Sequence, residues 1–122
     1  MKTTKIIYWV TTGLLSALLL MSAGMYLFKN DDVSAMFELF GYPTYIIYPL
    51  AFAKITAVVV LWLPKFKKLK EWVYSALFFE FILAVFAHVM IEDGGQMASI
   101  MAIVLLLTSY FTLNKIEASK IN

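Results

Sequence analysis

The sequence predicts an all-α integral membrane protein, built as a four-helix bundle. The first observation is composition, because 62% of the 122 residues are hydrophobic and the mean hydropathy is +0.83, whereas soluble domains are about 45–50% apolar. The second is that four apolar runs of membrane-spanning length are separated by short polar segments. The third is that the ten basic residues are all lysines and most of them lie beside the ends of these runs.

The four apolar runs predict four transmembrane helices in a single membrane domain over residues 1–122. A spanning helix needs roughly 20 apolar residues, and barrel strands would instead alternate polar and apolar side chains. The expected helices lie at about residues 6–28, 44–63, 72–91 and 97–113.

A signal peptide is the alternative for the first run, because Lys2 and Lys5 precede it and small residues occupy 22–24. The apolar part continues to Phe28, however, and is longer than the roughly 7–15 residues of a signal-peptide core. We therefore expect a retained helix.

The loop after the first run contains a shorter helical pattern. Asp31 and Asp32 are suitable N-cap residues, and apolar residues follow at helical spacing as far as Phe40. Gly41 and Pro43 are stop signals. We expect a short amphipathic helix at about residues 32–40, in the first extracytoplasmic loop, which lies on the outer interface or caps the bundle. Capping is preferred to partner binding.

The lysines predict the orientation. They cluster on one side of the predicted membrane, at Lys2, Lys5, Lys65, Lys67, Lys68, Lys70, Lys115 and Lys120. Acidic residues prevail in the loops on the other side, at Asp31, Asp32, Glu38, Glu92 and Asp93. Because lysine-rich flanks stay inside, both termini are expected in the cytoplasm and the protein in the cytoplasmic (plasma) membrane.

Three ionisable residues lie within the predicted spans, and such residues are candidates for function by default. Counting the rise per residue places Lys54 about 15 Å below the outer boundary and Glu80 about 13 Å above the inner one. In a core about 30 Å thick both lie near the midplane, so we expect them to pair. Proton transfer that leaves both neutral is the alternative. His88 is expected about 12 Å further outward on the same face as Glu80.

The same count places Ser16, Thr108 and Ser109 near this depth, as supporting polar groups. Two interpretations stay open. In the first, the pair fixes the helix register and the hydroxyls complete its hydrogen bonds. In the second, Lys54, Glu80 and His88 line a polar cavity that opens to the outer face and holds a ligand or moves protons. His88 could instead be an interface histidine bonded to a carbonyl.

Other chemistry has little support. The chain has no cysteine, which excludes disulfides, thiolate nucleophiles and cysteine-ligated metals. One histidine and scattered carboxylates do not make a haem or di-metal site, so no metal is expected. We assign no catalytic residue, because no serine nucleophile with a base is recognisable. The lysines form no basic stripe of the kind that binds nucleic acid.

Several segments, taken in order, resemble one protein family. They are FGYPTY, AFAKITAVVVLWLP and LKEWVYSALFFEFILAVFAH, followed by an acidic loop with glycines. The chain resembles the DoxX-like family of small four-helix membrane proteins from about Tyr8 to Leu113, including Pro64 and His88. The resemblance implies a bundle in the cytoplasmic membrane. Its relatives are linked to thiosulfate:quinone oxidoreductases, to membrane-associated thiol redox complexes and, in distant animal members, to receptor assembly.

The leading functional hypothesis is an accessory or ligand-binding membrane protein with a buried Lys54–Glu80 centre. One alternative is a quinone-linked oxidoreductase component of the thiosulfate or thiol type, in which a quinone is the candidate cofactor and a partner subunit supplies the redox centre. The others are an assembly factor for membrane proteins and a carrier of protons or small molecules. The lipid bilayer is an expected partner, and a membrane protein or a second copy of the chain is a further candidate. The sequence does not decide whether the protein is an enzyme.

Overall fold

The computed structural model describes residues 2–63, 66–92 and 94–121. Pro64, Lys65 and Asp93, which the sequence places in loops, lie outside the described residues. The helices are α1 (Lys2–Phe28), α2 (Asn30–Phe40), the short 3-10 helix η1 (Thr44–Ile46), α3 (Ile47–Leu61), α4 (Lys67–Ile91) and α5 (Gln96–Ile121). Within these described residues, four segments are long and apolar enough to cross a membrane. The predicted all-α membrane bundle is therefore confirmed.

Three of the long helices extend beyond the ranges that apolarity predicts. α1 begins at Lys2 rather than at residue 6, α4 at Lys67 rather than at 72, and α5 continues to Ile121 rather than ending at 113. Lysine, leucine and glutamate favour helix, so the helices continue after the apolar run ends. An ion pair of 3.0 Å between Nζ of Lys67 and Oε2 of Glu117 joins the extensions of α4 and α5.

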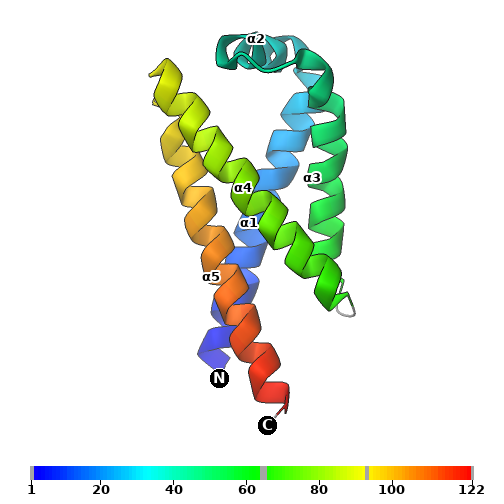
Figure 1. The fold of residues 1–122 in the computed structure, drawn as a ribbon. Coiled ribbons are helices and arrows are strands. Elements are labelled where there is room, and N and C mark those ends of the chain that lie inside the picture. The colour runs from blue at the N-terminus through cyan, green and yellow to red at the C-terminus, as the bar shows by residue number, and fades with distance from the viewer. Residues whose placement is uncertain (1, 64–65, 93, 122) are drawn as a thin grey trace.

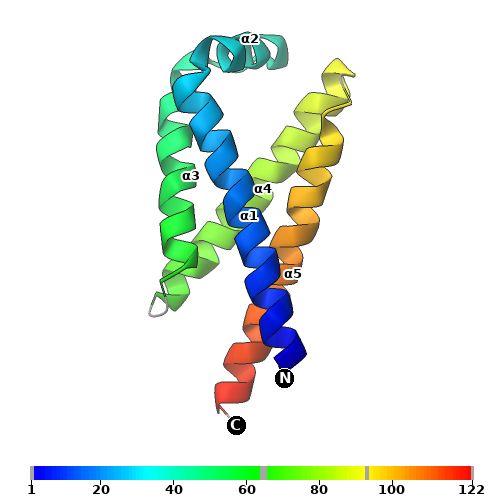
Figure 2. The same ribbon diagram turned by 180° about the vertical axis from the view of Figure 1, so that it is seen from behind.

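The four long helices form a ring in the order α1, α3, α4, α5. α1 packs closely along α3 and α5, and α4 packs along α5, whereas α3 and α4 make the fewest contacts of these neighbours. Figure 1 shows the reason. α4 starts near the end of α3 and slants away from it toward the start of α5. Both termini lie at one end of the bundle, and α2 lies across the other, as the view from behind in Figure 2 also shows. We call these the terminal end and the α2 end.

The core is built from one stripe of each long helix. In α1 the stripe includes Leu15 and Leu19, in α3 Ala57 and Leu61, and in α4 and α5 it is made of Tyr74, Leu77, Phe81, Ala102 and Leu106. These positions recur at helical spacing, which is why one face of each helix is buried and the rest meets lipid. Pro49 lies in the first turn of α3, where the missing N–H has no intrahelical acceptor to lose.

The short helix α2 covers the α2 end of the bundle. Its buried residues Val33 and Phe37 pack against Ile47 of α3, and the Phe37 ring lies 5.7 Å from that of Tyr26 of α1. Gly41 ends α2 with a φ of 79°, a left-handed conformation that glycine adopts without strain. α2 therefore caps the bundle.

We expect the Phe37→Ala variant to release α2 from the bundle. Removing a buried aromatic side chain costs about 3–5 kcal/mol, so amide hydrogen exchange in α2 should accelerate and the melting temperature in detergent should fall. Leu39→Ala is the matched control on the same helix, because Leu39 is exposed. Equal exchange in the two variants would contradict the capping role.

Candidate functional site

α3 places Lys54 on its buried face. The stripe Ile47, Ala51, Lys54, Ala57 and Leu61 is buried along the whole helix, and the lysine occupies the middle of it. The alanines on either side of Lys54 are small, so they leave room for the long side chain beside α1. The local sequence thus directs a cation into the bundle and not toward lipid.

The structure brings Lys54 and Glu80 into contact. The Lys54 Nζ lies 2.6 Å from the Glu80 Oε1, and the two side chains are 6% and 28% exposed. The Lys54 Nζ also lies 5.2 Å from the centre of the Tyr26 ring, where the face of the aromatic ring attracts a cation. Lys54 is therefore held by a carboxylate of α4 and a ring of α1.

The apolar surroundings of Lys54 and Glu80 raise the free-energy cost of leaving either charge unpaired. An unpaired charge near the middle of a membrane helix costs at least ~2.5–3.5 kcal/mol on insertion scales. A carboxylate at hydrogen-bond distance lowers that cost, and the remaining attraction is stronger in a medium that excludes water. The pair also bridges α3 and α4, which otherwise make few contacts.

The supporting hydroxyls do not surround the pair, which corrects the sequence-based expectation. Ser16 accepts a hydrogen bond of 2.9 Å from the Trp62 Nε1, and Thr108 donates to the Val104 carbonyl of its own helix. Ser16 lies ten residues from Tyr26, about 15 Å along α1 toward the terminal end. The depths estimated from the rise per residue assumed that all helices stand upright and begin and end at the same membrane boundaries. In the structure α1 begins earlier than predicted and α4 is tilted (Figure 1).

Ser109 belongs to a second polar cluster nearer the terminal end. Its Oγ lies 2.6 Å from the Thr12 Oγ1 and 2.7 Å from the Tyr74 Oη. All three side chains are buried, and they come from α5, α1 and α4. Because each hydroxyl can both donate and accept, the three satisfy one another inside the apolar core. We call this the hydroxyl cluster.

His88 lies at the α2 end and not against the Lys54–Glu80 pair. Its ring contacts that of Phe40, with the centres 5.1 Å apart. A Cβ atom on residue 95 would lie 2.5 Å from the His88 Nδ1, so a larger residue in place of Gly95 would displace the His88 ring. His88 thus joins α4 to α2 and to the loop before α5, on the side of the pair toward the α2 end.

α2 covers both parts of the predicted site. Phe37 contacts Tyr26, which holds Lys54, and Phe40 contacts His88. Two hollows in the surface lie elsewhere, one at the start of α4 and one between α4 and α5 that includes Tyr74, Phe78 and Tyr110. A cavity that leads through His88 to the pair stays a prediction.

Sequence reasoning missed Tyr26 as a partner of Lys54 and did not connect Thr12, Tyr74 and Ser109. A signal for them was present. Tyr8, Thr12 and Ser16 recur every four residues on the buried stripe of α1, and Tyr74 opens the buried stripe of α4. Polar residues on a stripe that otherwise faces a core indicate partners on a neighbouring helix.

Comparison with known proteins gives one match. The model of the DoxX-like family matches residues 10–111, which include every residue of the pair, the hydroxyl cluster and His88. No curated protein and no solved structure matches this sequence.

We expect Ser109→Ala to destabilise the bundle more than Thr108→Ala. The first change leaves the buried Thr12 and Tyr74 hydroxyls without their shared partner, at a cost of about 1–3 kcal/mol. The second removes only a bond to the backbone of the same helix. Thermal unfolding in one detergent measures both, and equal melting temperatures would show that the cluster does not stabilise the fold.

Proposed function

Since the chain belongs to the DoxX-like family, we propose that this multi-pass membrane protein is an accessory, ligand-binding protein with the Lys54–Glu80 pair as its polar centre. An accessory role implies that the ligand-bound protein acts on a membrane-protein partner or on a second copy of the chain. Such a role needs no catalytic residue within the chain itself.

The difference in exposure between the two partners is the observation that carries the proposal. The Lys54 side chain is 6% exposed and that of Glu80 is 28% exposed. Among residues 2–63, 66–92 and 94–121, Glu80 has no polar partner besides Lys54. A carboxylate offers about four acceptor positions. A ligand with a hydroxyl or amine can therefore donate to Glu80 while the ion pair stays intact.

A purely structural role explains the pair less well. Polar contacts between membrane helices contribute about 0.6 kcal/mol on average, and apolar substitutes for a buried ion pair are often neutral or stabilising. Ligand binding gives a reason to keep a charge that the fold itself does not require.

The proposed orientation sets the side from which the ligand arrives. The terminal end carries Lys67, Lys68 and Lys115, whereas the α2 end carries Asp31 and Glu92. Lysine-rich flanks stay on the cytoplasmic side. The α2 end then faces outward, and α2 with His88 lies between the pair and the outer surface.

A quinone-linked redox component is the second candidate. A proton donor and a proton acceptor lie 2.6 Å apart beside the Tyr26 ring. A quinone oxygen accepts a hydrogen bond from such a donor, and a quinol hydroxyl donates one to such an acceptor. The electrons would come from a redox centre on a partner subunit.

Mass spectrometry of a solvent extract of the purified protein tests the proposal. We expect one small molecule to accompany the wild type and to be lost from the Lys54→Met/Glu80→Leu double variant. Lys115→Met/Glu38→Leu is the matched control, because it removes one exposed lysine and one exposed glutamate that lie outside the pair, and it should retain the molecule. An isoprenoid quinone in the extract would select the second candidate.

Absence of any such molecule from the wild type, or its retention in the double variant, would contradict ligand binding at the pair. Circular dichroism and melting of each variant separate loss of the ligand from loss of the fold.

A further inference from the structure

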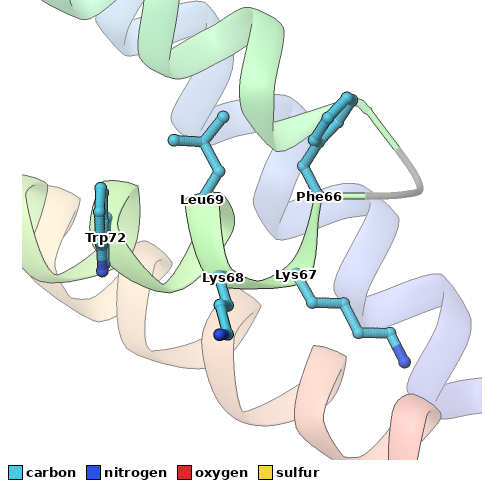
Figure 3. A pocket seen from close by; sticks show the side chains of 5 residues that line it. All are labelled: Phe66, Lys67, Lys68, Leu69 and Trp72. Atoms are coloured by element: carbon cyan, nitrogen blue, oxygen red, sulfur yellow. The ribbon is translucent and has the colours of Figure 1, made fainter.

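The start of α4 forms a hollow that combines cations with apolar side chains. It has a volume of about 510 Å³ and is lined by Phe66, Lys67, Lys68, Leu69 and Trp72. In Figure 3 the two lysines project to one side of the first turn, and Phe66 and Leu69 project to the other. The hollow is separate from the Lys54–Glu80 pair and from the hydroxyl cluster.

The charges around this hollow are only partly balanced. Lys67 pairs with Glu117, and Glu71 accepts a hydrogen bond of 2.8 Å from the Tyr110 hydroxyl. Within the part of the chain that the structure describes, Lys68 has no acidic partner. The first turn of α4 contains no acidic residue. An excess of positive charge therefore remains, and it suits an anionic group.

The apolar residues are placed where the chain leaves the membrane. Trp72, Phe66 and Leu69 are 73%, 51% and 40% exposed, and they lie at the start of a helix long enough to span a bilayer. Trp72 lies five residues beyond Lys67, about 7.5 Å along the axis toward the bilayer. Tryptophan prefers the membrane interface, so Lys67 and Lys68 reach the level of the phosphates while Leu69 and Trp72, which follow them along α4, reach the acyl chains.

We propose that this hollow binds an anionic glycerophospholipid from the leaflet at the terminal end. Lys68 and Lys67 contact the phosphate, and Leu69 and Trp72 contact the first part of the acyl chains. Charge complementarity selects the anionic headgroup, and the apolar lining selects a lipid over a free anion. The site does not depend on what binds at Lys54 and Glu80.

Native mass spectrometry of the full chain tests this site. The protein is exchanged into micelles that contain equal amounts of phosphatidylglycerol and phosphatidylcholine. We expect the wild type to retain phosphatidylglycerol preferentially, with one lipid bound at saturation. Lys68→Gln should weaken this retention about fivefold, the effect of one basic residue at a membrane surface.

Lys115→Gln is the matched control, because Lys115 is an exposed lysine of α5 at the same end that does not line the hollow. It should change retention less than twofold. Equal retention of the two lipids by the wild type, or equal losses in the two variants, would overturn the proposal. Displacement of the lipid by equimolar inorganic phosphate would also overturn it, since the site would then recognise a free anion. Melting of the Lys68→Gln variant verifies its fold.

Discussion

The contact between Lys54 and Glu80 is the constraint that sets the rest of the arrangement, because a charge that the bundle buries must find its partner inside the bundle. Lipid offers no water to a buried ammonium, so Lys54 requires a partner inside the protein. Glu80 supplies it at 2.6 Å and Tyr26 adds an aromatic face. The contact joins α3 to α4, the neighbours that otherwise touch least. Because α4 slants away from α3, the long side chains of Lys54 and Glu80 reach across a separation between the two helices that small apolar side chains would not span.

Two sets of polar contacts, at different heights along the bundle, fix how the helices align. The pair and Tyr26 link α1, α3 and α4 toward the α2 end, while Thr12, Ser109 and Tyr74 link α1, α5 and α4 toward the terminal end. Apolar contacts in lipid are weakly directional, since lipid tails compete equally for them. Hydrogen bonds and the ion pair are satisfied in one alignment only. The fold therefore holds the Lys54–Glu80 pair in a defined place beneath the cap formed by α2.

Much of this arrangement could be predicted from the sequence, and the part that could not has a physical cause. The lengths of the apolar runs predicted the spanning helices, the helical spacing and the stop residue Gly41 indicated α2, and matched depths paired Lys54 with Glu80. The N-cap expected at Asp31 or Asp32 was wrong, because α2 begins at Asn30 and both aspartates lie in its first turn. Ser16 and Thr108 were assigned to the wrong surroundings, because tilt and axial offset come from packing against neighbours rather than from the length of an apolar run. Tyr26 was missed for the same reason, since its contact with Lys54 depends on where α1 ends relative to α3.

A double-mutant cycle on the free energy of unfolding tests the central role of the pair most directly. Lys54→Met and Glu80→Leu are each expected to cost about 3–5 kcal/mol, because each leaves one buried charge without its partner. The double variant should recover most of this loss. The Lys67–Glu117 pair, which is exposed at its lysine, should show a coupling of about 0.2–1 kcal/mol in the same detergent. Additive losses at Lys54 and Glu80, with a double variant no more stable than the worse single one, would contradict the account.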